Sequence, residues 1–495
     1  MLVLLAFVVV VVDFYEIMCF NVLTFKCMYV HVCSSSELLE AHRYIYMMLK
    51  KMITHVVLFV LTMVNVQGDN NGEICIVGAG IGGAATAYFS KSRKTRVFEA
   101  RDYVGGRLKH FVMDDQTIEL GGDAWSSANE YVEKIAKDLG INTTTTSHTD
   151  NSNNKWLDPV SKSLSVWNGT TLLNGEEILI EHGISDLHGI VDEALFLVRI
   201  KGNYMERGET HSFSSIDEFL RYGRLDEYTS ISSRDYFTNQ HIATATQLDL
   251  LEPLMRCIYG QGLNAHAFAT LVALTSMVGA SSVSSGNSDL VRAMFRSANS
   301  SIHLSTKVER IQKSTSSNTL TIETQDNTSY TCQDVVIAAP IEFTNITFEN
   351  INVTITPPRK FENCTVTVVK AKSVNVSYFN LDDASKVPNN IFTTSKASES
   401  TPFTVMQLEA GDLKDGYSIW KFFSVQSVPI HDIFIDIAQV KIQKWPYTFP
   451  HLEPNPTFQP IKLAPHVYYL NTMESIASAM EVSIIAGRNI AMLLN

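Results

Sequence analysis

The residues of this sequence with the clearest chemical pattern are three glycines and one carboxylate. Gly78, Gly80 and Gly83 form G-x-G-x-x-G directly after the apolar run EICIV, and Glu99 ends the next apolar run nineteen residues after Gly80. In such a turn the glycines allow a tight bend, close approach of the backbone to a pyrophosphate, and close packing of a helix on the strand. The carboxylate can accept hydrogen bonds from both ribose hydroxyls. The spacing therefore predicts a dinucleotide-binding unit of strand, turn, helix and strand.

A second glycine turn follows the carboxylate and favours FAD over NAD. Gly105 and Gly106 form a turn from which Arg107 can reach back to the pyrophosphate as a charge-assisted donor. ELGGDAW at 119–125 supplies another Gly-Gly turn near the same end of the sheet. Extended runs of this kind resemble the FAD-binding halves of the flavin amine-oxidase superfamily. A plain surface turn at GGR is the alternative interpretation.

Segments far along the chain are expected to complete the same domain. HLSTKVERI at 303–311 is interpreted as the strand whose Val308 backbone faces the adenine, and DVVIAAP at 334–340 as the next parallel strand. The segment 468–491 reads as a strand, a turn with Glu474 and a long amphipathic helix. The N-terminal end of such a helix favours negative charge on a reduced flavin. A purely structural helix is the alternative.

Four motifs resemble the prenylcysteine oxidase family, also called farnesylcysteine lyases. They are ICIVGAGIGG at 74–83, VGGRL at 104–108, IYGQ at 258–261 and YYLNTMESIASAMEVS at 468–483. The first two are shared across the flavin amine-oxidase-like superfamily, whereas the last two are much more specific. WPYTFPHLEP is also similar to the aromatic, proline-rich approach to the last strand in that family. The resemblance covers the chain from about residue 73 to its end.

The resemblance implies an FAD-dependent thioether oxidase of the lysosome that degrades S-prenyl-L-cysteine (farnesyl- or geranylgeranylcysteine) left by prenylated proteins. The implied products are cysteine, the prenyl aldehyde and hydrogen peroxide, with O2 as the electron acceptor. Carbon 1 of the prenyl group is allylic and next to sulfur, so a hydride leaving it for flavin N5 generates a stabilised cation. Water then adds, and the hemithioacetal collapses. Because the flavin supplies the difficult step, the protein needs no strong base.

Two candidate residues near the flavin and the substrate, Tyr259 and Gln261, stand at the end of an apolar, helix-like run. Their alternative role is structural, as part of a helix C-terminal cap at Gly260. The apolar stretches ALFLVRI at 194–200 and AFATLVALTSM at 267–277 could line a channel for the prenyl chain, although such stripes are more often plain core.

The loop at 280–290 departs from the family pattern. The family carries a Trp-x-Val-Glu-Gly-Gly-Asn-like segment, and ASSVSSGNSDL here keeps Val283, Gly286 and Asn287 but lacks the tryptophan and the glutamate. The resemblance implies that this loop lies close to the flavin. Its change bears on the substrate preference and, to a smaller extent, on the activity.

Two other functions stay open at this point. A flavin-dependent amine oxidase would use the same cofactor on C–N bonds, and some such enzymes attach flavin through a cysteine near the C-terminus. Residues 365–495 contain no cysteine, which favours non-covalent FAD. A secreted flavin- or lipid-binding homologue without turnover is the other alternative, and only the 280–290 loop favours it.

The N-terminal segment predicts entry into the secretory pathway. Residues 52–68 are interpreted as a signal peptide, because two lysines precede an apolar stretch that ends near Gly68. Residues 1–51 are interpreted as an upstream extension, and no stable transmembrane span is expected; a signal anchor is the alternative. Lysosomal localisation follows from the resemblance, with secretion as the alternative. The net charge of −12 without a Lys/Arg-rich block argues against a nucleic-acid partner.

Four cysteines follow the predicted signal peptide: Cys75, Cys257, Cys332 and Cys364. Cys75 lies inside an apolar strand and is expected to be a buried thiol, while a bridge between Cys332 and Cys364 is left open. No cysteine or histidine cluster predicts a metal site. N-linked glycans are predicted at eight N-x-S/T sequons, which are Asn142, Asn168, Asn299, Asn327, Asn345, Asn352, Asn363 and Asn375.

Together these patterns predict an α/β protein with a discontinuous, Rossmann-like, three-layer FAD-binding domain and a mixed-sheet substrate domain. The FAD-binding domain is assigned to residues 73–125, 283–345 and 460–495. The substrate domain is assigned to the two intervening stretches, 126–282 and 346–459.

Overall fold

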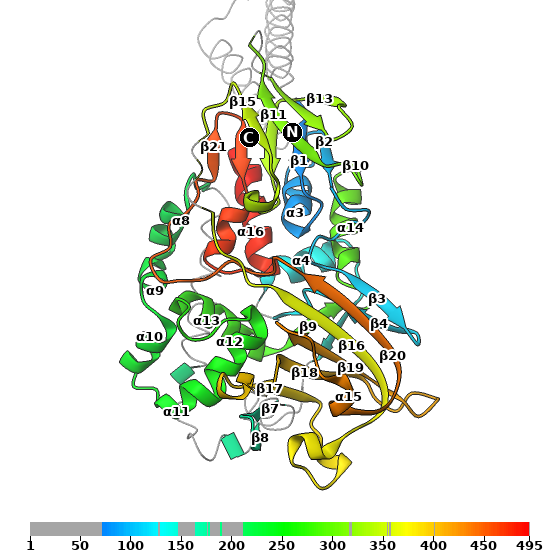
Figure 1. Ribbon diagram of the computed structural model, residues 1–495. Helices are drawn as coiled ribbons and strands as arrows, with labels where there is room; N and C mark the ends of the chain where they lie inside the picture. Colours follow the sequence, from blue (N-terminus) through cyan, green and yellow to red (C-terminus); the bar gives the residue numbers. More distant parts are fainter. Residues whose placement is uncertain are drawn as a thin grey trace, which may run out of the picture. The chain divides into compact units, whose positions relative to one another are not determined.

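The computed structural model describes residues 72–126, 129–146, 164–175, 177–178, 189–190, 211–315, 319–353, 355, 358–399 and 401–494. The strand before the glycine turn, β1 (Ile74–Val77), lies inside a six-stranded sheet of order β10-β2-β1-β14-β22-β21 (Figure 1). β1 pairs in parallel with β2 and β14, and β14 pairs in parallel with β22. The remaining bounds are β2 (Thr95–Phe98), β10 (Ser301–His303), β14 (Asp334–Ile337), β21 (Lys462–Ala464) and β22 (Val467–Tyr469).

The alternating side chains of β1 enter two different cores, which gives this part of the protein three layers. Ile74 and Ile76 pack with helices on one face of the sheet, whereas Cys75 and Val77 pack with a four-stranded sheet on the other. The helices are α3 (Ile81–Phe89), α14 (Ser288–Ser297) and α16 (Met480–Leu493). The second sheet consists of β11 (Val308–Lys313), β12 (Leu320–Thr324), β13 (Ser329–Cys332) and β15 (Thr347–Glu349). The predicted three-layer α/β architecture is confirmed.

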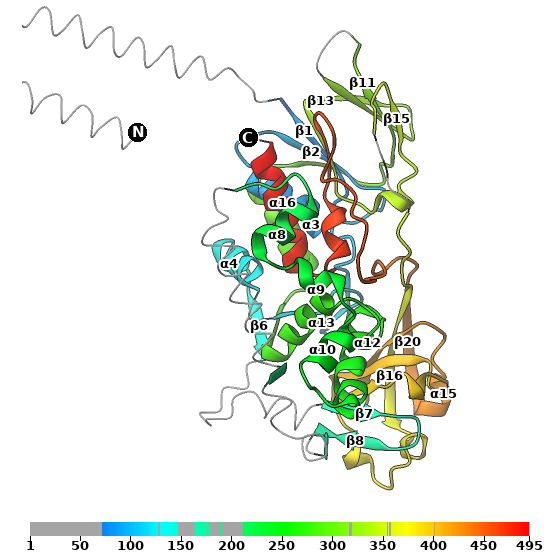
Figure 2. The ribbon, with the colours of Figure 1, turned by 90° about the vertical axis from the view of Figure 1, so that its left-hand side faces the viewer.

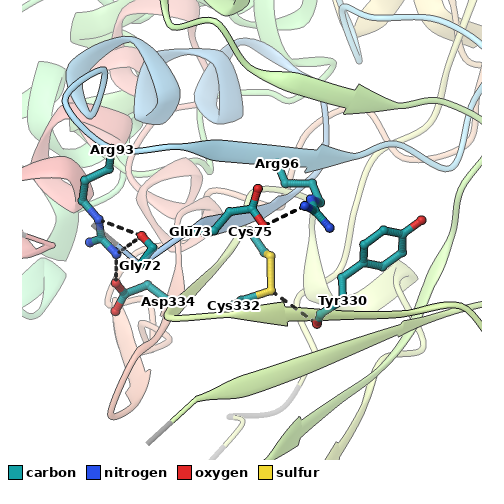
Figure 3. Close-up of a disulfide and its surroundings, with 8 residues drawn as sticks. All are labelled: Gly72, Glu73, Cys75, Arg93, Arg96, Tyr330, Cys332 and Asp334. Carbon is teal, nitrogen blue, oxygen red and sulfur yellow. Dashed lines mark hydrogen bonds and ion pairs between the residues drawn. A yellow bond between two sulfur atoms is a disulfide. The ribbon is translucent and has the colours of Figure 1, made fainter. Parts of the chain in front are cut away.

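A disulfide between Cys75 and Cys332 joins two of these layers (Figure 3). The expectation of a free thiol at Cys75 was therefore wrong, and Cys332 does not pair with Cys364, which is free. Periodicity could not show this bond, because its cysteines are 257 residues apart and only the packing of β13 beside β1 brings them together. Close by, Arg93 donates a 2.6 Å hydrogen bond to Asp334 in a buried ion pair. Covalent and ionic contacts thus close this end of the sheet.

A seven-stranded sheet of order β20-β16-β19-β18-β17-β7-β8 forms the other large part of the fold. The sheet is mixed, as predicted. β17 pairs in parallel with β7, and the other neighbouring strands of the sheet pair antiparallel. Its bounds are β7 (Leu164–Trp167), β8 (Leu172–Asn174), β16 (Cys364–Val374), β17 (Asn390–Thr393), β18 (Phe403–Ala410), β19 (Ser418–Ser424) and β20 (Phe434–Trp445). Both faces of β16 are buried, since Val369 lies in one core and Val366 and Val368 lie in another.

Helices and smaller sheets surround these two parts. Figure 2 shows α9, α10, α12 and α13 as one group beside β16 and β20. The helices are α4 (Glu130–Asp138), α8 (Ile216–Gly223), α9 (Asp226–Ser230), α10 (Ser233–Asn239), α11 (Thr244–Thr246), α12 (Glu252–Tyr259), α13 (Ala267–Leu274) and α15 (Ile430–Ile433), with the 3-10 turns η4 (Ile341–Phe343) and η8 (Asn471–Ser475). The smaller strands are β3 (His110–Met113), β4 (Gln116–Glu119), β5 (Trp125–Ser126), β6 (Thr143–Thr146) and β9 (Ala280–Val283).

Two expected elements differ from the structure. The strand expected at 303–311 is two strands, since β10 ends at His303 and β11 begins at Val308 after a turn in which Ser305 has a φ of 51°. The last helix, α16, is not amphipathic in the sense of a surface helix, because it packs against both α3 and α4 and is buried almost all round.

The domain boundaries stay a prediction, although the six-stranded sheet takes strands from all three stretches assigned to the FAD-binding domain. The predicted extension at 1–51, the signal peptide at 52–68 and the stretch 194–200 lie outside the described residues. Within the described residues, every helix falls short of the length and apolar character that crossing a membrane requires.

Candidate functional site

The two predicted glycine turns lie against each other at the end of β1. Gly80 and Gly105 form a parallel backbone bridge, and the amide of Gly105 donates a 3.0 Å hydrogen bond to the carbonyl of Ala79. Gly78 has a φ of 115°, and a Cβ there would lie 2.6 Å from the carbonyl oxygen of Ala338. A Cβ on Gly83 would collide with the carbonyl oxygen of Gly78. These positions require glycine because backbones of different segments approach closely there.

The carboxylate of Glu99 points at the first glycine turn. Its Oε2 accepts a 2.8 Å hydrogen bond from the amide of Ala79, and its Oε1 accepts a 2.9 Å bond from the amide of Arg101. The turn after β10 lies on the Glu99 backbone, whose carbonyl accepts from the amide of Thr306 at 2.8 Å. Val308 follows two residues later, with its side chain in the core behind the sheet. The structure thus places Glu99 and Val308 near the same end of the predicted site.

Arg107 and Glu474, predicted from opposite ends of the chain to serve one cofactor, are in direct contact as an ion pair. Arg107 also donates to the carbonyl of Thr448 at 2.6 Å. Asn471 donates from Nδ2 to Glu474 at 2.7 Å. Among the described residues, Glu474 Oε2 and Asn471 Oδ1 are buried oxygens without a hydrogen-bond partner. Glu474 and Asn471 therefore present two oxygens that can accept hydrogen bonds from a bound molecule.

Two residues that sequence reasoning missed hold the segment around Glu474. Arg359 donates to the carbonyl of Asn471 at 2.8 Å and to both carboxylate oxygens of Glu342, at 2.6 and 3.0 Å. Burial acts to raise the pKa of Glu342, but the hydrogen bond and charge of Arg359 lower it overall. His266 lies near the carbonyl of Ser475 at 3.2 Å, and burial lowers its pKa to about 4, so the ring is neutral. Nothing in their local sequence marks either residue.

The catalytic candidates Tyr259 and Gln261 have different surroundings. Gln261 is a structural clamp, since Nε2 donates to the carbonyl of Pro450 at 3.0 Å and Oε1 accepts from the amide of Leu452 at 2.9 Å. Tyr259 is fully buried, and its hydroxyl has no hydrogen-bond partner among the described residues. Its ring packs edge-on against Phe449, next to the carbonyl that Arg107 binds. Burial raises the pKa of Tyr259, so the phenol stays neutral.

The structural interpretation of the same motif also holds. Gly260 ends α12 in the left-handed conformation with a φ of 66°, as the alternative predicted. The segment from Thr448 to Leu452 therefore runs between Arg107 on one side and the Tyr-Gly-Gln turn on the other. This arrangement brings Tyr259 close to the predicted cofactor residues, whereas Gln261 acts on the backbone alone.

A buried lysine, which sequence reasoning also missed, lies beside the Gly-Gly turn at 121–122. Lys421 on β19 is fully buried and lies 2.7 Å from Asp123 Oδ1 and 2.7 Å from Glu409 Oε1. Burial alone would lower the pKa of Lys421, but the two carboxylates raise it, so the ammonium stays charged. The one signal in the sequence is a single lysine inside the apolar strand SIWKFFS.

The altered loop at 280–290 connects this cluster to α14. Asn287 donates from its amide to Glu119 Oε1 at 2.5 Å and from Nδ2 to the carbonyls of Gly122 and Asp123. Gly286 has a φ of 107°, and a Cβ there would enter the ring of His110. Two of the three residues that this chain keeps from the family pattern, Gly286 and Asn287, therefore have structural roles. The position of the missing tryptophan, Ser281, lies directly across the strand pair from Trp125.

These residues fit a bound dinucleotide. The first turn of α3 begins at Gly80 without a side-chain cap and without an acidic residue, so its amide groups can face phosphate. Glu99 lies next to that turn, and Arg107 follows Gly106, whose backbone approaches Gly80. The unpartnered oxygens of Glu474 and Asn471 suit hydroxyl donors. In the part of the chain described, no group of three His, Cys, Asp or Glu side chains could hold a metal ion.

Comparison with solved structures supports the same fold. Cyclohexylamine oxidase from Brevibacterium oxydans is 12% identical, with a TM-score of 0.55 over 86% of this chain and 98% of that chain. Wild-type putrescine oxidase bound to putrescine is 12% identical, with a TM-score of 0.51 over 85% of this chain and 98% of that chain. At such identities the likeness shows the architecture alone.

Sequence comparison identifies relatives over most of the chain. Prenylcysteine oxidase 1 of Homo sapiens is 27% identical over 463 residues, covering 85% of this chain and 88% of that protein. Farnesylcysteine lyase of Arabidopsis thaliana is 25% identical over 469 residues, covering 87% and 89%. A NAD(P)-binding Rossmann-like domain model matches residues 76–139, and the prenylcysteine lyase model matches residues 178–495, more than half of the sequence. The chain therefore belongs to the prenylcysteine lyase family.

Proposed function

We propose that the protein is an FAD-dependent thioether oxidase that cleaves S-prenyl-L-cysteine. Prenylcysteine, water and O2 would give cysteine, the prenyl aldehyde and hydrogen peroxide. The proposal is supported by the family and by relatives named prenylcysteine oxidase and farnesylcysteine lyase. The observation that carries it is the contact between Arg107 and Glu474, because it joins the glycine turns of one end of the chain to the family motif of the other.

Five groups of this chain would hold FAD without a covalent bond. Glu99 would accept hydrogen bonds from the ribose, and the N-terminus of α3 with Arg107 would bind the pyrophosphate. Glu474 and Asn471 would accept hydrogen bonds from hydroxyl groups of the cofactor. Residues 365–495 contain no cysteine that could attach the flavin. The bound flavin would supply the acceptor for a hydride from carbon 1 of the prenyl group.

The protein's own contribution is to hold carbon 1 of the substrate in position and to exclude competing reactions. The bond cleaved lies between an allylic carbon and sulfur, so loss of hydride leaves a cation that both neighbours stabilise. Water adds at that carbon, and the hemithioacetal releases the thiol as the aldehyde forms. Tyr259 is a buried, neutral phenol whose hydroxyl has no hydrogen-bond partner among the described residues, so it is suited to donate to an oxygen or sulfur atom of the reacting group.

We further propose that the protein enters the secretory pathway and works in the lysosome, with secretion as the alternative. The buried disulfide between Cys75 and Cys332 supports an oxidising compartment during folding. None of the eight sequon asparagines is buried, and six of them are exposed: Asn142, Asn299, Asn327, Asn345, Asn352 and Asn363. Exposed sequons are accessible to glycosylation.

An anaerobic absorbance spectrum before and after S-farnesyl-L-cysteine tests the proposed activity. The expected result is absorbance bands at about 370 and 450 nm that bleach when the substrate is added, as for an oxidised flavin that accepts a hydride. Bands that bleach only with amines would favour an amine oxidase, and bands that bleach with neither would favour a binding protein. A folded protein that binds no flavin would overturn the cofactor assignment.

A further inference from the structure

Three carboxyl groups surround one buried lysine beside the Gly-Gly turn at 121–122. Lys421 is paired with Asp123 and Glu409, each at 2.7 Å. Glu119 is an electrostatic neighbour of all three, and its Oε2 is buried without a hydrogen-bond partner among the described residues. The cluster therefore contains three carboxyl groups and one ammonium group.

Burial changes two of these carboxyl groups in the same direction. It raises the pKa of Glu119 to about 8, so this carboxyl is neutral near pH 7, and it raises the pKa of Glu409 against the lowering effect of Lys421. The third carboxyl group, that of Asp123, contacts Lys421 through Oδ1. A carboxylate has a second oxygen, which can accept hydrogen bonds from a cationic ligand.

Asp123 is the member of the cluster that a ligand can reach. Its side chain is 33% exposed, compared with 12% for Glu409 and 0% for Lys421. Asn287 fixes the backbone by donating to the carbonyl oxygens of Gly122, at 2.9 Å, and Asp123, at 2.8 Å. The amide of Gly122 in turn donates to the carbonyl of Arg107. The carboxylate is thus held on the same turn that backs a predicted cofactor residue.

We propose that Asp123 binds the α-ammonium group of the cysteine moiety of the substrate, while Lys421 and Glu409 hold its carboxylate in position. The assignment rests on the proposed function, since it concerns a substrate that carries an amino acid. A primary ammonium brings one positive charge and three N–H donors, which match the partly exposed carboxylate of Asp123. Lys421 is not available for the substrate's carboxylate, because both of its ionic partners belong to the protein.

The test compares S-farnesyl-L-cysteine with S-farnesyl-3-mercaptopropionate, which keeps the thioether and the carboxylate but lacks the ammonium group. We expect Asp123→Asn to lower kcat/KM for farnesylcysteine about 10- to 100-fold, the range of a hydrogen bond to a charged group, and to change it for the desamino compound less than about threefold. Asp382→Asn, a charge-matched change at an exposed site, should affect neither substrate. Equal losses for both substrates would overturn the assignment.

A binding measurement separates this inference from the proposed activity. S-hexadecyl-L-cysteine has no allylic hydrogen, so its affinity can be measured by calorimetry without turnover. Tighter binding of this compound than of its desamino analogue in the wild type, lost in Asp123→Asn, would support the site even if farnesylcysteine is not oxidised. The same preference in Asp123→Asn as in the wild type would reject it. Asp123→Glu should keep the preference, and thermal melting of each variant would show that the protein is folded.

Discussion

At the scale of single residues, the carboxylate of Glu99 has a structural contact and a proposed role in binding FAD, and a variant can test the second. Its carboxylate holds the amides of Ala79 and Arg101, and we assign it to the ribose of FAD. Glu99→Gln keeps the size but replaces one acceptor oxygen by a donor, so we expect FAD to bind about 10- to 100-fold more weakly. Equilibrium titration of the flavin-free protein with FAD would measure this change.

The matched control for that variant is Glu73→Gln. Glu73 lies at the start of the same βαβ unit and pairs with Arg96 at 2.9 Å on the surface, away from the glycine turn. Surface ion pairs contribute little to stability, so this variant should keep the wild-type affinity for FAD. Equal FAD affinities for Glu99→Gln and Glu73→Gln would contradict the ribose assignment.

Also at the scale of single residues, the raised pKa of Glu119 predicts a pH dependence of stability. Its pKa rises from 4.5 to about 8 on folding, chiefly through burial. The folded protein therefore holds a proton that the unfolded chain has lost, and the free energy of unfolding falls as pH rises from about 4.5 to 8, by about 5 kcal/mol at most. Glu119→Gln should remove this part of the slope.

Urea unfolding at pH 5, 6.5 and 8 would test the pH prediction, because the other titrating groups are common to both proteins. His266 contributes in the opposite direction. Its pKa falls from 6.5 to about 4 on folding, so the free energy of unfolding decreases as pH falls from about 6.5 to 4. This term cancels in the difference between wild type and variant. Parallel pH profiles for the two proteins would show that Glu119 is ionised in the folded state.

At the scale of elements, the turn before α14 predicts a large effect of a small substitution. Gly286→Ala would place a methyl group in the ring of His110 at a φ of 107°, and we expect a loss of about 2–4 kcal/mol in unfolding free energy. Gly140→Ala is the control, because its φ of 65° is also left-handed but nothing lies within 4 Å of the added carbon. Gly140→Ala should lower the unfolding free energy by about 1 kcal/mol. Denaturant unfolding would compare them, and equal losses would mean that His110 moves aside freely.

The elements also show which parts of the fold the sequence could predict. β1, the glycine turn, α3 and β2 follow from local residue types, because 27 consecutive residues contain the whole unit. The break between β10 and β11 was missed, because Ser305 takes a left-handed conformation for which its residue type carries no signal. The burial of α16 was missed as well, since it depends on both α3 and α4 packing against this helix.

In the candidate site, too, local sequence patterns could be predicted and long-range contacts could not. Gly78, Gly80, Gly83 and Glu99 could be predicted because the chemistry fixes their spacing. Pairs such as Asp123 with Lys421 are 298 residues apart, and only the packing of the second Gly-Gly turn on β19 brings them together. Arg359 is a similar case, because its partners come from η4 and η8. Long-range contacts of charged groups carry no periodic signal in a single sequence.

At the scale of the whole molecule, the disulfide links folding to the cellular compartment. It crosses from β1 to β13 and closes a loop of 257 residues, so the cross-link removes much conformational freedom from the unfolded chain. Both cysteines are buried, Cys75 within the first strand of the predicted nucleotide-binding sheet and Cys332 at the end of β13 (Figure 3). Loss of the bond is therefore expected to loosen the layer that carries the glycine turn.

The double variant Cys75→Ala with Cys332→Ala tests this expectation. We expect a loss of about 3–5 kcal/mol in unfolding free energy, with flavin released at lower temperature than in the wild type, because the sheet behind the glycine turn is no longer tied to β13. Cys364→Ser, a change at a free cysteine, should leave both transitions close to those of the wild type. Thermal melting followed by flavin fluorescence and by circular dichroism would measure them together. If flavin release and unfolding stay unchanged in the double variant, the two layers are held by their apolar contacts alone, and the fold would be equally stable in a reducing compartment.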